Sequence, residues 1–185
     1  MTSLLFNPSV RIAGTKALLL GWLFIVLTAF IAYFSHCHFD GAIDAHQGSQ
    51  SVWWLYLAEP LLAWLCTVLM FYITGRIASS SKVRLVDIAG TMALARWPML
   101  FVALLFFIPV TLPANRLDIP PALILFSLVV LVFSIWMLAL MYNAYRVSCN
   151  VKGSKAVISF IVALILTEVL SKFVFDLLYK TVLRH

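Results

Sequence analysis

The sequence predicts an all-α membrane protein, with residues 1–185 forming one domain: a polytopic bundle of five transmembrane helices. Of the 185 residues, 64% are hydrophobic and only 11% are charged, whereas a soluble domain is about 45–50% apolar and about 25% charged. The mean hydropathy is +1.05. The apolar residues fall into five runs, each close to the roughly 20 residues that a helix needs to cross the hydrocarbon core. The composition and the five runs, which leave only short connections and no room for a soluble domain, exclude a cytosolic enzyme, a disulfide scaffold and a disordered chain.

The boundaries between the runs carry the residues expected at a membrane surface. The first run is longer than the roughly 7–15 apolar residues of a signal peptide, and no small-residue cleavage site follows it, so it is a span. Aromatic residues open the second run and close the fourth, as is typical of the membrane–water interface. Prolines bracket a short turn between the third and fourth runs. The predicted spans are residues 17–34, 52–73, 91–112, 122–142 and 156–178.

The distribution of Lys and Arg predicts that the N-terminus faces the cytoplasm and the C-terminus the outside. Cytoplasmic connections of membrane proteins are enriched in these residues. Nine of the thirteen lie on the N-terminal side: Arg11, Lys16, Arg76, Lys82, Arg84, Arg96, Arg146, Lys152 and Lys155. Three lie on the other side: Arg116, Lys180 and Arg184. Because the cations sit between apolar runs and not on one soluble face, the net charge of +6 does not indicate nucleic-acid binding.

The fifth span carries the densest set of polar residues. Glu168, Lys172 and Asp176 recur every four residues and therefore share one helix face with Ser171 and Tyr179. An ionisable group at membrane depth costs about 2.5–3.5 kcal/mol even on lenient insertion scales, so each one indicates a site. One interpretation is an ion- or proton-coupled path in which Glu168 changes protonation state. The other is a self-neutralising stripe that faces the bundle interior and fixes helix packing.

Glu59 is a further acidic residue at membrane depth, about two turns into the second span. Lys172 lies at a similar depth in the fifth span, so we expect these spans to touch and Glu59 to neutralise Lys172. Pro60 predicts a kink in the second span, and Pro98 an interruption of the third. Arg96 is expected to extend towards lipid phosphates.

The loop between the first and second spans holds three of the four histidines, together with two aspartates and Cys37. Imidazole, thiolate and carboxylate groups together suit zinc or a similar transition metal. The spacing matches no closed structural zinc pattern, and such side chains in loops are often simply solvated. Metal binding is therefore one alternative for this loop, with His36, His38, Asp40, Asp44 and His46 as the ligands.

Sequence signatures of known enzyme sites are not found. The chain contains no GxSxG elbow, no glycine-rich phosphate loop and no HExxH helix, which disfavours an enzyme without excluding one. The three cysteines, Cys37, Cys66 and Cys149, form neither a disulfide framework nor a paired-thiol motif.

Several short motifs are spread over nearly the whole chain. They are Phe6-Asn7-Pro8, His38-Phe39-Asp40-Gly41, Asp87-Ile88-Ala89-Gly90-Thr91 with Arg96-Trp97-Pro98, and a stretch from Tyr142-Asn143-Ala144-Tyr145 through Cys149-Asn150 and Lys152-Gly153 to Glu168 and Ser171-Lys172. In these motifs the chain resembles the Yip domain family of Ypt/Rab-GTPase-interacting membrane proteins, and in particular a bacterial branch of it. The resemblance implies a five-span module without known chemistry. Eukaryotic members carry a long cytosolic N-terminal segment that engages small GTPases, whereas about 16 residues precede the first span here, so GTPase recruitment is not expected.

Three functions fit these observations. The first is a membrane scaffold or accessory protein that acts through lateral contacts with lipids, other membrane proteins or a second copy of itself. The alternative is a small ion- or proton-coupled transporter or channel that uses Glu59, Glu168, Lys172 and Asp176. The last is a metal-binding protein, or a membrane hydrolase, that uses the first loop. In each case we expect a multi-pass protein of the bacterial inner membrane.

Overall fold

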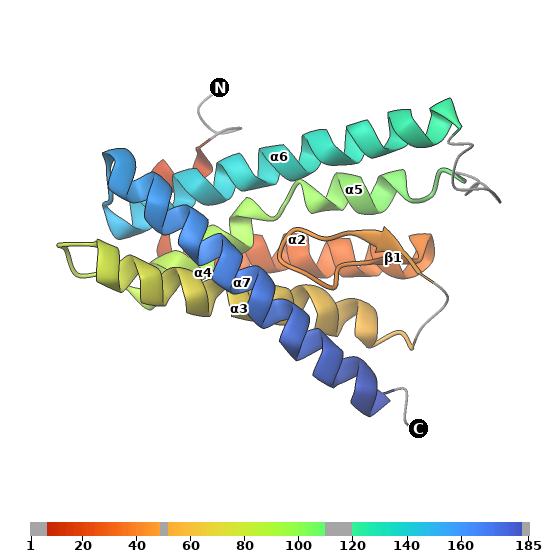
Figure 1. The fold of residues 1–185 in the computed structure, drawn as a ribbon, viewed down its shortest axis with the longest axis horizontal. Coiled ribbons are helices and arrows are strands. Elements are labelled where there is room, and N and C mark those ends of the chain that lie inside the picture. Colours follow the sequence, from red (N-terminus) through yellow and green to blue (C-terminus); the bar gives the residue numbers. More distant parts are fainter. Residues whose placement is uncertain (1–6, 49–51, 110–119, 183–185) are drawn as a thin grey trace.

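The structure, a computed structural model, describes residues 7–48, 52–109 and 120–182. These residues form a helical bundle with one small hairpin (Figure 1). In chain order the elements are η1 (Pro8–Val10), α2 (Gly14–Ser35), β1 (Cys37–His38), β2 (His46–Gln47), α3 (Leu55–Ala78), α4 (Leu85–Ala95), α5 (Met99–Leu105), α6 (Pro121–Cys149) and α7 (Gly153–Val182).

The prediction of five spans is confirmed, because five helical segments are long and apolar enough to cross a membrane. Most of them extend beyond the predicted ranges. The fourth span, for example, was expected to end at residue 142, but α6 continues to Cys149. Hydropathy falls at the membrane surface, whereas backbone hydrogen bonding continues until the left-handed residue Asn150 ends the helix (φ 50°). The predicted end of the third span, residue 112, lies outside the described residues.

The third span consists of two helices, α4 and α5, joined at Arg96-Trp97-Pro98. The predicted interruption at Pro98 is confirmed, and the cause is the missing backbone donor of proline. The Trp97 amide instead bonds the Leu94 carbonyl at 3.3 Å and tightens the last turn of α4. This span is the centre of the bundle: 72% of its most apolar stretch is buried, compared with 11% in α6. In the second span, α3 continues through Pro60.

Small residues let α2 pack closely on α4. A Cβ atom at Gly21 would lie 2.5 Å from the Cβ of Ala93, and one at Gly90 would lie 2.5 Å from the Gly14 carbonyl oxygen. No side chain fits at such distances, so glycine permits the close approach of the two helices. Close approach at small residues is a common way for helices to associate in a membrane, where lipid is as apolar as a leucine side chain.

The last two helices lie at the edge of the bundle. Helix α7 crosses the other helices diagonally (Figure 1) and packs mainly on α3. Its outward face exposes large apolar side chains such as Val169 and Phe173, which are 65% and 67% exposed. Exposed apolar residues on this scale indicate a surface that meets lipid or another membrane protein.

Residues 36–48, here called the first loop, fold back against the bundle. Strands β1 and β2 pair antiparallel, and the Gly48 amide donates to the His36 carbonyl at 3.0 Å. Cys37, Phe39 and Ala42 are at most 2% exposed, so the middle of the loop is inserted between the helices. Irregular backbone inside a membrane protein must have its polar groups satisfied by protein or water. The side chains that do so form the candidate site.

Candidate functional site

Glu59 anchors the start of the first loop to α3. Its carboxylate is completely buried and has three partners. His38 Nδ1 lies 2.8 Å from Oε1, the Phe39 amide donates to Oε2 at 3.1 Å, and the Tyr179 hydroxyl donates to Oε1 at 2.7 Å. One carboxylate thus connects the first loop, α3 and α7.

The tip of the first loop is held by two further ionisable side chains. Arg96, only 5% exposed, donates from Nη1 to the Ala42 carbonyl at 3.0 Å, and Glu168 accepts from the Ile43 amide at 3.0 Å. The break between α4 and α5 places Arg96 under the loop. The carbonyl and the amide of one peptide group in the loop are therefore bonded by a cation from the third span and a carboxylate from the fifth.

The remaining polar residues of α7 form ion pairs closer to solvent. Lys172 pairs with Asp44 of the first loop, and Asp176 pairs with Lys180 one turn further along α7 at 2.6 Å. All four side chains are at least half exposed. Ser171 is buried and its hydroxyl donates to the Glu168 carbonyl at 3.0 Å. The predicted polar face of the fifth span therefore exists, and two of its side chains, Glu168 and Lys172, contact the first loop.

Asp40 and His46 form a second pair within the loop, with Oδ1 and Nδ1 3.2 Å apart. The hydrogen bond to Asp40 raises the pKa of His46, and the same hydrogen bond lowers the pKa of Asp40. The rings of His46 and His38 stack at 5.7 Å. Burial, followed by the nearby charge of Glu59, raises the pKa of Cys37, so this thiol is not a reactive thiolate.

Two pairing predictions from the sequence are wrong. Lys172 pairs with Asp44 and not with Glu59, although the spans that carry these residues do touch. Arg96 does not extend to lipid phosphates, because it is buried under the loop. Both errors have one cause. Depth along a helix does not reveal that the first loop enters the bundle, where Ala42 and Asp44 become the partners of Arg96 and Lys172.

The sequence interpretation also missed the role of Tyr179. Its position on the polar face of α7 was visible, but its hydrogen bond to Glu59 depends on the crossing of α7 over α3 (Figure 1). Nothing in the hydropathy pattern of the sequence signals that crossing.

The five candidate metal ligands do not converge on one point in the structure. His38 bonds Glu59, Asp40 pairs with His46, and Asp44 pairs with Lys172. His36 ends α2 in a left-handed conformation (φ 54°). Within the described ranges, no group of three or more His, Cys, Asp and Glu side chains is placed to hold a metal ion.

The space around the buried part of the site is small. The cavity between Phe39, Pro60 and Arg96 measures about 10 Å³, which is the lower limit for a single water molecule. The side chains around this cavity therefore pack closely against the loop.

Comparison with known families now adds an independent result. The model of the Yip1 domain matches residues 3–171, which is most of the chain. The chain belongs to the Yip1 domain family. No curated protein and no solved structure matches it.

The Yip1 domain match includes the first loop and three of the side chains that hold it, Glu59, Arg96 and Glu168. It ends at residue 171, so Lys172, Asp176 and Tyr179 lie beyond it. The resemblance seen in the sequence motifs is confirmed, and the protein is a multi-pass membrane member of this family.

Proposed function

We propose that this Yip1-domain protein is a membrane scaffold or accessory protein that acts through lateral contacts in the bilayer. The observation that supports this proposal most directly is the use of the buried Glu59 and Arg96 and the half-buried Glu168. Glu59, Arg96 and Glu168 each bind the first loop of the same chain. Charges that are committed to holding the fold are not available to carry an ion, whereas a rigid bundle with an apolar outer surface suits contacts with other membrane components.

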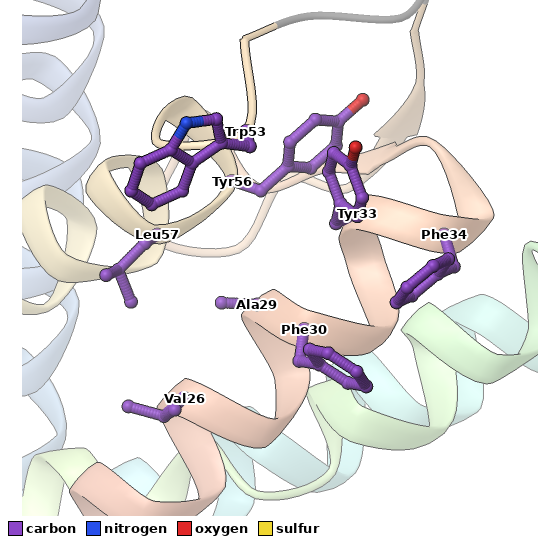
Figure 2. A pocket seen from close by; sticks show the side chains of 8 residues that line it. All are labelled: Val26, Ala29, Phe30, Tyr33, Phe34, Trp53, Tyr56 and Leu57. Atoms are coloured by element: carbon purple, nitrogen blue, oxygen red, sulfur yellow. The ribbon is translucent and has the colours of Figure 1, made fainter.

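An apolar groove between α2 and α3 is the best-formed lateral surface. It has a volume of about 380 Å³ and opens to the side of the bundle. Figure 2 shows Val26 of α2 on the same side as Leu57 of α3 and Trp53, which precedes α3, whereas the rings of Phe30 and Phe34 lie farther to the right in the view. Trp53 and Phe30 are 68% and 64% exposed. The hydroxyls of its two tyrosines gather at one end of the groove, where an interfacial level is expected (Figure 2).

Site-specific photo-crosslinking in native membranes tests this proposal. A photoreactive residue at Phe34, in the groove, is expected to give cross-links to one defined membrane protein. Leu131 on α6 is the matched control, because it is apolar and 52% exposed, against 54% for Phe34, but lies outside the groove. Equal products at both positions would contradict the groove as the contact surface.

A proton- or ion-coupled transporter is the second candidate, and one observation favours it. Asp40, His46, His38, Glu59 and Tyr179 are neighbours in a series that runs from the half-exposed His46 to the buried Glu59. Such a series resembles the carboxylate and histidine chains of proton pathways.

Flux measurements separate the two candidates. Proteoliposomes that contain the purified chain and a pH-sensitive dye are expected to show the same proton leak as protein-free liposomes. A leak that requires the protein and is abolished by Glu59→Gln, but not by Asp176→Asn, would establish the transporter instead.

The proposed setting is the bacterial inner membrane with the N-terminus in the cytoplasm. The excess of Lys and Arg on the N-terminal side of the spans supports this orientation. A reporter enzyme fused after the last residue is expected to be active only outside the cytoplasm. An inactive fusion that is produced at normal levels and lies on the cytoplasmic side would contradict this orientation.

A further inference from the structure

A polar pocket lies at the opposite end of the bundle from the first loop. It measures about 410 Å³ and is formed by the segment before α2, the last turns of α6 and the turn that leads into α7. Asn7, Asn143 and Asn150 contribute side-chain amides, and Arg146 and Lys152 contribute positive charges. None of these residues takes part in the site around the first loop.

The pocket is cationic. No acidic side chain lines it, and in the part of the chain that the structure describes neither Arg146 nor Lys152 forms an ion pair. The Arg146 guanidinium lies 5.5 Å from the centre of the Tyr142 ring, which positions the charge without neutralising it. Lys155 adds a further positive charge within three residues of Lys152. The pocket therefore suits an anion.

One polar atom of the pocket lacks a partner. The side-chain oxygen of Asn7 is buried and accepts no hydrogen bond from the described residues. A buried acceptor without a donor is unfavourable, and a headgroup hydroxyl would satisfy it once the Asn7 side chain turns towards the pocket. The pocket thus offers two cations for a phosphate and a nearby acceptor for a hydroxyl.

We propose that this pocket binds the headgroup of an anionic phospholipid, with the phosphate at Arg146 and Lys152 and a headgroup hydroxyl at Asn7. The pocket lies where α6 ends and α7 begins, the level at which lipid phosphates meet a membrane protein. Basic pockets between spans on the cytoplasmic side suit acidic headgroups, and the charge distribution predicts that this end faces the cytoplasm. Phosphatidylglycerol carries both a phosphate and hydroxyls.

Native mass spectrometry of the full chain in detergent tests the proposal. Phosphatidylglycerol and, separately, phosphatidylcholine are titrated and the bound lipids counted. The double variant Arg146→Gln/Lys152→Gln is expected to bind phosphatidylglycerol about tenfold more weakly, since each cation adds to the attraction. Its weak binding of phosphatidylcholine should not change.

The variant Arg76→Gln/Lys82→Gln is the matched control. It removes the same charge from the same end of the bundle, outside the pocket, and should bind phosphatidylglycerol like the unmodified chain. Thermal unfolding of each variant confirms that it is folded. The proposal is overturned if the pocket variant binds as before, or if the control loses as much affinity. It is also overturned if inorganic phosphate at millimolar concentration displaces the lipid, because the site would then take free phosphate.

Discussion

The two ends of the bundle are held together by different interactions. At one end, three spans meet the first loop through four charged side chains: Glu59, Arg96, Glu168 and Lys172 each bind a group of residues 38–44. At the other end, α2, α4, α3 and α6 meet at small residues. A Cβ at Gly75 would lie 2.5 Å from the Cys149 sulfur, and the Thr91 and Ser148 hydroxyls are 2.9 Å apart.

This difference follows from the backbone that each end must bury. Helices satisfy their own amides and carbonyls, so two helices can pack with small side chains and a neutral hydrogen bond. In the first loop, the amides of Phe39 and Ile43 and the carbonyl of Ala42 are bonded by ionisable side chains. Charges at membrane depth in this protein therefore mark the place where irregular backbone enters the bundle.

Glu59→Ala is expected to have the largest effect on the loop end. It removes the common partner of His38, Phe39 and Tyr179, and breaking a buried pair costs about 3–5 kcal/mol. Chemical unfolding in detergent micelles measures the loss. Asp176→Asn is the control, since it alters an exposed carboxylate of the neighbouring helix α7. If both variants unfold alike, Glu59 does not hold the loop.

Gly90→Val tests the small-residue end. The added side chain meets the Gly14 carbonyl and the Leu18 amide, and overpacking of this kind costs about 1–3 kcal/mol. Leu19→Val on the exposed face of α2 controls for β-branching in a helix. Thermal unfolding of both variants in the same detergent should show a loss only for Gly90→Val. An unchanged melting temperature would mean that α2 and α4 are not closely packed.

The Lys172–Asp44 pair should contribute much less than Glu59, because both side chains are about half exposed. A double-mutant cycle with Lys172→Met and Asp44→Asn is expected to give a coupling free energy of about 0.2–1 kcal/mol. A parallel cycle of Lys172→Met with Glu59→Gln should give additive losses. Strong coupling in that second cycle would contradict the structure and support the Lys172–Glu59 pair that was expected from the sequence.

The Asp40–His46 pair gives the smallest effect, on pH dependence. Its raised pKa means that His46 contributes stability below its unfolded pKa and loses it as the pH rises through the folded value. The lowered pKa of Asp40 means that its contribution is lost as the pH falls through that lower value. The stability contributions of both groups are therefore fully present between about pH 4 and pH 6.5, the ordinary pKa values of Asp and His. Because His46 is half exposed, solvent screening keeps the stability change small.

NMR titration of the His46 ring measures this directly. Its midpoint should lie above the usual value of about 6.5 and return towards it in Asp40→Asn. The variant Asp176→Asn should leave the midpoint where it is. If the His46 midpoint is the same in Asp40→Asn as in the unmodified chain, the Asp40–His46 pair does not form.

Much of the architecture was readable from particular residues. The run of apolar residues from Ala17 to Phe34 and the break at Pro98 were predicted correctly because hydropathy and the missing proline donor act locally. The polar face of α7 followed from helical spacing alone. The partners on that face did not follow: Asp44 and Lys172 are 128 residues apart, and only the folded loop brings them together.

By itself, then, the sequence determined which segments cross the membrane and which side chains are too polar to face lipid. These properties depend on composition and on the 3.6-residue period of the helix. The tertiary structure decided what those side chains bind. Its deciding step is the insertion of the first loop between α3, α7 and the break after α4, because the loop's unpaired backbone groups must find partners inside the bundle.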